Sequence, residues 1–257
     1  MTFLTEKQIQ TLENWMREAY DRGYLEGLNS IIVKQPDAPA TTEKIYPIHN
    51  CIPDISSFQK DINYDELCNG SDFIILRARY CNKTDSTFEE RAKEMNKHDM
   101  PFAVYDYAML RSHAHAKEQA ETFYNLCAPY NPRIYYIDTE QLSSYATYAT
   151  EMEYIKTYVA RLRELGAEIV GQYTGDWLYS TYYKKLQDYF DTLWIASYGK
   201  DTGKDEGVAL KSAEFTDKID LHQFTSKGVI PGVPTKGDLS SLTGHRPLSW
   251  FTGRVYE

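Results

Sequence analysis

The sequence Tyr135-Tyr136-Ile137-Asp138-Thr139-Glu140 is a short apolar run that ends in two carboxylates. Side chains two positions apart in a β-strand point to the same side, so Asp138 and Glu140 are expected to project together from a strand end. Two neighbouring carboxylates do not ionise independently, and one of them tends to keep its proton near neutral pH. Such a pair is typical of general acid catalysis, above all in glycosidic-bond hydrolysis. The same pattern also occurs where a strand passes into a solvated loop, so the surrounding sequence must decide between the two interpretations.

Strand and helix patterns alternate on both sides of this stretch. Apolar runs typical of buried parallel strands occur at residues 48–55, 73–79, 102–107, 134–137, 169–173, 193–198 and 219–224. Helical patterns lie between them at 88–95, 116–127 and 152–165, and Gly166 suits the C-cap of the last one. Helical periodicity fades after Tyr198. This order predicts an α/β fold with a parallel sheet or barrel, in which loops join the last strands.

The chain divides into three segments, namely an N-terminal helix over residues 1–34, a linker over residues 35–47, and a barrel over residues 48–257. An apolar stripe with alternating three- and four-residue steps runs along the first segment, at Ile9, Leu12, Met16 and Ala19. A short isolated helix is marginal in water and must bury such a stripe. Residues 1–33 are therefore expected either to dock on the body of their own chain or to mediate self-association or partner binding.

Composition excludes several classes of function. The formal net charge of the 257 residues is −9, which argues against nucleic acid and gives no attraction to an anionic membrane. No segment approaches ~20 apolar residues, so membrane insertion is not expected. Residues 1–7 show no signal-peptide pattern, which predicts synthesis in a cytoplasm. The four cysteines lack paired zinc-ligand spacing, so neither a metal nor a cofactor is expected. The charged run 89–94 is interpreted as a solvated helix face.

Acidic and aromatic side chains are expected at one end of the barrel. In a parallel barrel, chemistry takes place at the carboxyl ends of the strands. The acidic residues Asp54, Asp138 and Glu140 end predicted strands, and Asp238 lies in a late polar segment that could close the barrel. The aromatic residues at or near the same ends are Tyr105, Tyr107, Tyr173, Trp194 and Tyr198. Carboxylates and aromatic rings on one rim predict a carbohydrate cleft.

Short motifs stand in the order found in one known family. They are D-I-S-S-F-Q at 54–59, F-I-I-L-R-A at 73–78, P-F-A-V-Y-D-Y at 101–107, D-T-E at 138–140, G-Q-Y-T at 171–174, L-W-I-A-S-Y-G at 193–199, H-Q-F-T-S at 222–226 and K-G-D-L at 236–239. From about His49 to about Leu242, the chain resembles the family-25 glycoside hydrolases, the lysozymes of phages and bacteria. It departs from them at Asp106, a rim position where the family usually has His.

The resemblance implies a TIM-like (β/α)5(β)3 barrel that cleaves the β-1,4 bond between N-acetylmuramic acid and N-acetylglucosamine in bacterial peptidoglycan. It implies that Glu140 is the general acid and that Asp138 stabilises developing positive charge or orients the substrate N-acetyl group. Asp54 and Asp238 would line the same pocket. Arg77 and Gln223, together with the five aromatic residues named above, complete the expected substrate-binding set.

Two further questions stay open at the level of sequence. A barrel of this kind could bind glycan without cutting it, or could serve as a structural virion component, although the presence of all four acidic residues favours an enzyme. The nucleophile is either a carboxylate or the acetamido oxygen of the substrate itself. The most direct interpretation is a phage endolysin-type muramidase that reaches the wall after release through a membrane lesion.

Overall fold

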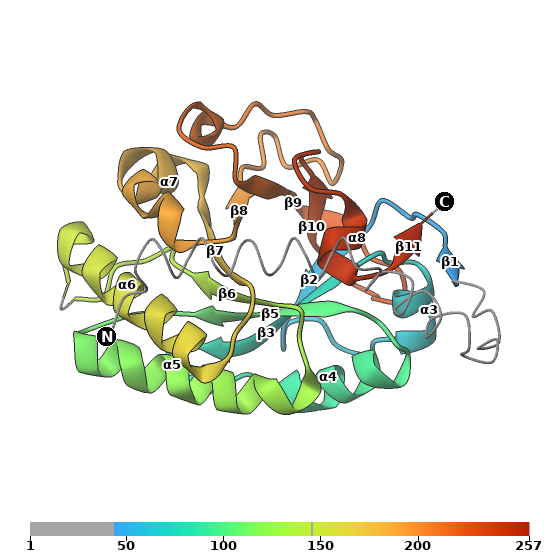
Figure 1. The fold of residues 1–257 in the computed structure, drawn as a ribbon. Helices are drawn as coiled ribbons and strands as arrows, with labels where there is room; N and C mark the ends of the chain where they lie inside the picture. The colour runs from blue at the N-terminus through green and yellow to red at the C-terminus, as the bar shows by residue number, and fades with distance from the viewer. Residues whose placement is uncertain (1–43, 145, 257) are drawn as a thin grey trace, which may run out of the picture. The chain divides into compact units, whose positions relative to one another are not determined.

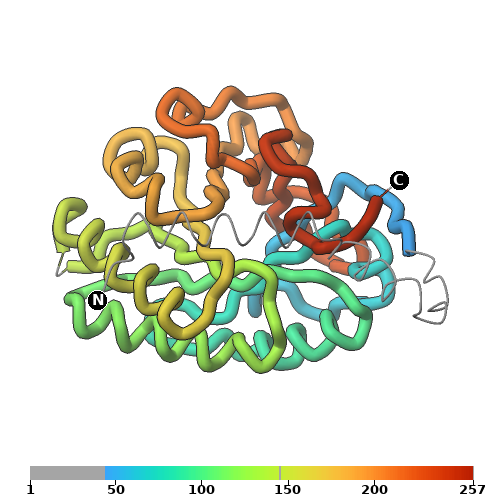
Figure 2. Tube along the Cα trace, in the orientation of Figure 1, coloured from blue at the N-terminus to red at the C-terminus, as the bar shows by residue number. Residues whose placement is uncertain are grey.

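The computed structural model describes residues 44–144 and 146–256. The predicted N-terminal helix, its apolar stripe and most of the linker lie outside the described residues. Within the predicted linker, Ile45–Tyr46 forms strand β1, which pairs in parallel with β11 (Val255–Tyr256). Figure 2 shows these two ends of the described chain side by side. Part of the predicted linker is therefore a strand that pairs with the C-terminal segment.

Eight strands form a closed barrel (Figure 1). They are β2 (Ile52–Ile55), β3 (Ile74–Tyr80), β5 (Phe102–Tyr107), β6 (Ile134–Asp138), β7 (Val170–Gly175), β8 (Thr192–Ala196), β9 (Ile219–Val229) and β10 (Lys236–Leu242). Neighbours from β2 to β9 pair in parallel, whereas β10 runs antiparallel to both β9 and β2 and so closes the ring. A short strand β4 (Lys83–Thr84) extends β3 outside the ring. The prediction of a TIM-like barrel is confirmed.

A helix follows each of the first five barrel strands. They are α3 (Tyr64–Asn69), α4 (Phe88–Lys97), α5 (His113–Cys127), α6 (Tyr148–Leu165) and α7 (Asp176–Thr181), with the 3-10 turns η1 (Ala128–Tyr130) and η2 (Tyr183–Tyr189). Between β8 and β9, a loop carries a single 3-10 turn, η3 (Lys211–Glu214). The C-cap of α6 is Gly166 with φ 113°, a left-handed conformation that glycine adopts without strain. The (β/α)5(β)3 order matches the sequence prediction, and so does the loop that joins β8 to β9; the short helix α8 (Leu248–Thr252) follows β10.

Strand alternation separates two apolar layers. In β6, Tyr135 and Ile137 join the layer between the barrel and its helices, whereas Ile134 and Tyr136 join the interior of the barrel. The period of two then carries Asp138 into the barrel interior at the carboxyl end of the strand. The hydrophobic pattern of the strand therefore decides where the first carboxylate of the D-T-E motif points.

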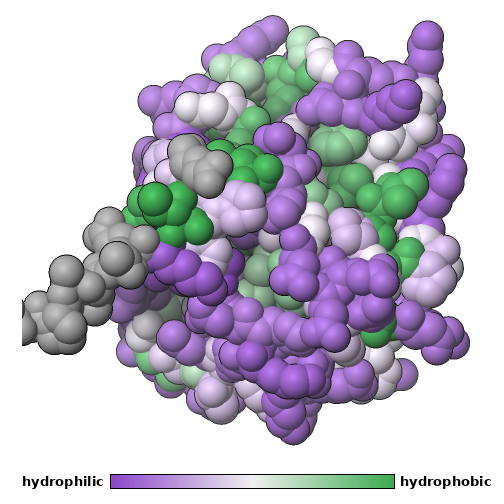
Figure 3. Space-filling model, turned by 90° about the vertical axis from the view of Figure 1, so that its right-hand side faces the viewer, coloured by the Kyte–Doolittle hydropathy of each residue, from purple (hydrophilic) through white to green (hydrophobic). Residues whose placement is uncertain are grey.

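The C-terminal segment closes the amino end of the barrel. Helix α8 (Leu248–Thr252) inserts Phe251 into the interior cluster, with its ring centroid 5.8 Å from that of Phe73. The Nε atom of Arg246 lies 3.2 Å from the carboxylate of buried Asp220, and its guanidinium stacks at 4.0 Å on Trp250. Figure 3 views the side on which β1, β11 and α8 lie, where hydrophobic areas interrupt a largely hydrophilic surface. This segment does not cover the opposite, carboxyl end of the barrel.

Two polar residues are placed differently from the sequence prediction. Asp106 does not reach the rim, because alternation along β5 turns it away from the interior and buries it against the helix layer. There it accepts a hydrogen bond from the Tyr158 hydroxyl at 2.8 Å and lies 3.7 Å from the guanidinium of Arg79. The second is Arg91, in the run predicted to be solvated. It is buried and donates to the carbonyls of Ser56 and Gln59.

Candidate active site

Four carboxylates gather at the carboxyl end of the barrel. Asp138 is the last residue of β6, and Glu140 follows two positions later. Asp54 on β2 stands opposite Asp238 on β10 in the antiparallel pair that closes the ring. Glu140 and Asp54 both act electrostatically on Asp138, and Asp238 acts on both Asp54 and Glu140. The structure thus brings together all four acidic residues singled out in the sequence.

Burial and mutual repulsion raise the pKa of every member of this cluster. Burial and then the charge of Asp238 hold the pKa of Asp54 well above its usual range, and burial followed by Glu140 does the same to the pKa of Asp138. Burial raises the pKa of Asp238 to about 6. Glu140 is exposed as a whole residue, yet desolvation of its carboxyl group and the nearby Asp238 still raise its pKa. Each carboxyl group of the cluster therefore loses its proton at a higher pH than the same group would in water.

The central residue of the D-T-E motif fixes the two carboxylates that flank it. The Thr139 amide donates to the carbonyl of Tyr173 at 3.0 Å, and its carbonyl accepts from the Thr174 hydroxyl at 2.7 Å. The Thr139 hydroxyl accepts from the Gln172 amide at 2.8 Å. These bonds tie the motif to β7. By contrast, the buried Oδ1 atom of Asp138 has no hydrogen-bond partner among the described residues, which is unusual for a buried carboxylate oxygen.

Gln223 orients Asp54. Its Oε1 atom accepts from the hydroxyls of Tyr173 and Tyr198, both at 2.7 Å, and its Nε2 atom donates to Asp54 Oδ2 at 2.7 Å. The two hydroxyl donors require an acceptor, so the amide can present only its NH2 group to the carboxylate. This bond favours the ionised form of Asp54 and opposes the effect of burial on its pKa.

Trp194 lies beneath the hydrogen bonds of Gln223 and not at the surface of the protein. The indole is 1% exposed and donates from Nε1 to the Ser240 hydroxyl at 2.9 Å. Its ring centroid lies 4.3 Å from that of Tyr173 and 6.0 Å from that of Tyr105. In this conformation it offers no free face to a sugar, contrary to its predicted role in substrate binding. Strand alternation accounts for the difference, because Trp194 belongs to the interior cluster.

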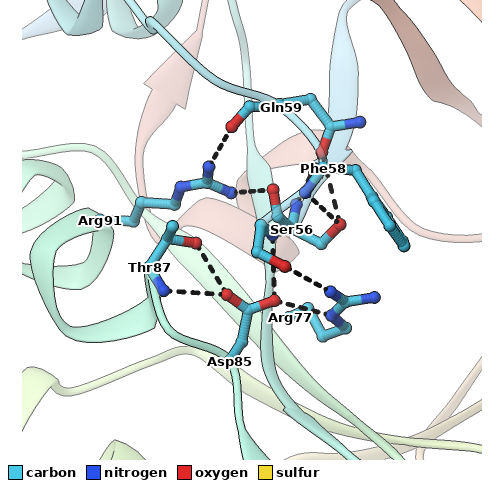
Figure 4. A network of polar contacts seen from close by, with 8 residues as sticks. Ser56, Phe58, Gln59, Arg77, Asp85, Thr87 and Arg91 are labelled. Carbon is cyan, nitrogen blue, oxygen red and sulfur yellow. Dashed lines mark hydrogen bonds and ion pairs between the residues drawn. The ribbon is translucent and has the colours of Figure 1, made fainter.

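Arg77 acts electrostatically on Asp138, and a network of polar contacts fixes its guanidinium (Figure 4). Its Nε donates to buried Asp85 at 2.8 Å, and its NH2 group donates to the Ser57 hydroxyl at 2.9 Å. The positive charge opposes the rise in the pKa of Asp138. Phe58, 76% exposed, lies over the guanidinium at 4.9 Å. The arginine is thus an immobilised counter-charge with an exposed aromatic neighbour.

The remaining predicted residues divide by exposure. Tyr105, Tyr107 and Tyr198 are partly exposed and can offer surface to a ligand, whereas Tyr173 and Gln223 are buried behind them. Two residues of this rim were missed in the sequence. Tyr80, whose ring stacks 4.8 Å from that of Tyr107, ends β3, and Phe58 follows the end of β2. An aromatic residue at or just after a strand end is the signal that identifies both.

Within residues 44–144 and 146–256, no group of three or more His, Cys, Asp or Glu side chains is arranged to hold a metal ion. In the same part of the chain, no helix combines the length and hydrophobicity required to cross a membrane.

The model of the glycosyl hydrolases family 25 matches residues 53–233. The chain belongs to this family and is a glycoside hydrolase. The family-25 match contains Asp54, Asp138 and Glu140, whereas Asp238 lies beyond it and joins the site through barrel closure. No match to a curated protein sequence was found.

Solved structures of family-25 members and lysozymes share this fold. A glycosyl hydrolase 25 of Streptococcus pneumoniae, described as a virulence factor participating in host cell invasion, is 30% identical with a TM-score of 0.65, over 77% of this chain and 89% of that one. The catalytic domain of an endolysin from a Listeria monocytogenes bacteriophage is 24% identical with a TM-score of 0.70, over 80% and 98%. A bacterial lysozyme from Streptomyces coelicolor is 17% identical with a TM-score of 0.63, over 82% and 99%.

Proposed function

We propose that this family-25 hydrolase cleaves the β-1,4 bond between N-acetylmuramic acid and N-acetylglucosamine in bacterial peptidoglycan. The observation that carries the proposal is the cluster of Asp54, Asp138, Glu140 and Asp238 at the carboxyl end of the barrel. Solved relatives that are described as lysozyme, muramidase and endolysin support the choice of substrate.

Glu140 acts as the general acid in this proposal. A proton donor must reach the leaving-group oxygen and must still be protonated when the substrate binds. Glu140 is the exposed member of the cluster, and desolvation together with Asp238 raises its pKa. It gives its proton to the leaving oxygen as the glycosidic bond breaks.

Asp138 orients the substrate and stabilises charge. Its unpartnered Oδ1 atom can accept a hydrogen bond from the N–H group of a substrate N-acetyl group. When ionised, the carboxylate also lies where it can stabilise the oxocarbenium-like transition state. Gln223 favours ionised Asp54 in the same pocket, which adds a second negative charge.

Replacement of Glu140 by Gln tests the assignment. The amide keeps the shape of the side chain but cannot act as the acid, so kcat is expected to fall by at least ~10²-fold. Turbidity of purified peptidoglycan and identification of N-acetylmuramic acid at the new reducing ends give the readout. Glu164→Gln is the matched control, because Glu164 is an exposed residue of α6 paired with Arg161. Near-normal activity of Glu140→Gln would reject the assignment.

The alternative, a barrel that binds glycan without cutting it or serves as a virion component, is distinguished by the same assay. It predicts that the wild-type protein releases no reducing ends from purified peptidoglycan. The four acidic residues, gathered with raised pKa values in one cluster, disfavour this alternative.

We also propose a biological setting, namely a bacteriophage or prophage lysin that is made in the host cytoplasm and acts on the wall after release. The likeness to the endolysin of a Listeria bacteriophage supports this setting. When expressed alone in a bacterium with a susceptible wall, the protein should leave culture turbidity unchanged until the membrane is permeabilised. Lysis without permeabilisation would contradict this proposal.

A further inference from the structure

An aromatic cluster of unassigned role stands beyond the carboxyl ends of β6 and β7. It consists of Tyr148, Trp177 and Tyr182. Trp177 is 61% exposed, more than any other tryptophan or tyrosine in the part of the chain that the structure describes. Its ring meets that of Tyr182 edge-on at 5.8 Å and 83°, and Tyr182 stacks on Tyr148 at 3.7 Å and 12°. The edge-on contact with Tyr182 supports the indole, while most of the indole surface stays exposed to water.

The chain topology places this cluster on the side of the active site. Trp177 lies in the first turn of α7, two residues after the end of β7, the strand that supplies Tyr173. Tyr148 is the first residue of α6, which follows the D-T-E motif at the end of β6. Both helices begin beyond the carboxyl ends of these neighbouring strands (Figure 1). The hydrogen bonds of Thr139 to Tyr173 and Thr174 lock the two strand ends together.

We propose that Trp177, supported by Tyr182 and Tyr148, is a distal subsite that binds a sugar ring of the glycan strand away from the cleaved bond. This inference rests on the proposed function, because the ligand of the subsite is the same glycan strand that Glu140 cleaves. The apolar face of a sugar ring packs well on a fixed aromatic ring that also has polar neighbours. A pre-organised ring binds at a lower entropic cost than a mobile one.

The negative net charge of the protein favours a short-range aromatic contact with the glycan over long-range electrostatic attraction. With a formal net charge of −9, the chain has no long-range attraction to an anionic wall polymer. Affinity for a long glycan must then come from short-range contacts along its length. A distal subsite adds such contacts without touching the reacting atoms, so it affects KM more than kcat.

The test uses the full-length protein and a series of peptide-free peptidoglycan glycan fragments of increasing length. For the wild type, KM should fall as fragments become long enough to reach Trp177. For Trp177→Ala, this gain should disappear, with KM on long fragments raised about 5- to 10-fold and kcat unchanged. Trp177→Phe should restore part of the gain, because it keeps an aromatic ring.

Tyr189→Ala is the matched control. Tyr189 is also exposed, at 41%, but it ends η2 just before β8 and so lies at the amino end of the barrel. Its removal should leave the length dependence intact. Wild-type kcat of Trp177→Ala on the shortest cleaved fragment shows that the variant is folded.

Each failure has a separate meaning. Absence of hydrolysis by the wild type would reject the proposed function. Hydrolysis by the wild type with the same length dependence in Trp177→Ala would reject only the distal subsite. Loss of intact-cell lysis without any change on purified glycan would also overturn the inference, because it would assign Trp177 to a different wall component.

Discussion

Replacement of Gln223 by Leu tests the network that orients Asp54. The substitution keeps a similar volume but removes the acceptor of two tyrosine hydroxyls and the donor to the carboxylate. Tyr198 is partly exposed, so its hydroxyl can turn to water. The Tyr173 hydroxyl and Asp54 are buried and lose a partner that nothing replaces. A buried neutral group left unpaired costs about 1–3 kcal/mol, and a charged group costs more.

The expected loss of stability for Gln223→Leu is therefore about 4 kcal/mol. For a chain of this size, that corresponds to a fall in Tm of about 8 to 16 °C. Differential scanning calorimetry measures it directly. Gln187→Leu is the matched control, because none of the described hydrogen bonds involves the side chain of Gln187, whose backbone carbonyl accepts from Lys218.

A second readout separates orientation of Asp54 from stability alone. The Gln223 hydrogen bond lowers the pKa of Asp54 against the larger effect of burial. Its loss raises that pKa further, so the acid limb of the kcat/KM profile should move to higher pH. A wild-type Tm, or an unchanged acid limb in a folded variant, would refute the reasoning.

The remaining predictions concern titration and the N-terminal segment. Because the pKa values of Asp54 and Asp138 are raised in the folded state, that state binds protons more tightly than the unfolded chain. Stability should rise as pH falls from neutral toward ~4, the unfolded pKa; a lower Tm at mildly acidic pH than at neutral pH would contradict this. Asp138→Asn should abolish activity yet raise Tm at neutral pH, and full activity would exclude the electrostatic role of Asp138. The wild-type kcat/KM profile should be bell-shaped with an acidic maximum, whereas a rate still rising in alkaline buffer would indicate a different acid. Deletion of residues 1–40 should leave the barrel folded and able to cleave soluble fragments; light scattering then tests self-association through residues 1–33, which predicts a lower mass after truncation.

The sequence predicts most of the barrel because parallel strands covered on both faces are nearly continuous apolar runs. Strand β10 gives no such signal. Its sequence, K-G-D-L-S-S-L, is largely polar, since it runs beside the active site and antiparallel to its neighbours. Helix α7 is six residues long, too short for its periodicity to be read. The local sequence pattern thus does not predict an element that is short or that faces the polar site.

The residues of the candidate site were also predicted only in part from the sequence. The carboxylates were identifiable because each ends a strand or belongs to a motif, and the topology alone brings strand ends together. What the sequence does not contain is the packing behind each side chain. Strand alternation sets the direction in which Asp106 and Trp194 point, but the side chains that contact them, Tyr158 and Ser240, come from elements distant in the chain.

The pairing of Asp54 with Asp238 also links completion of the acidic cluster to closure of the barrel. The two residues lie on the first and last barrel strands, so one pairing event both closes the ring and completes the acidic cluster. Until β10 has been synthesised, one edge of β2 and one edge of β9 remain unpaired. Late closure of a long-range contact is also a slow step in folding. A chain that lacks β10 therefore has neither a closed barrel nor a complete acidic cluster.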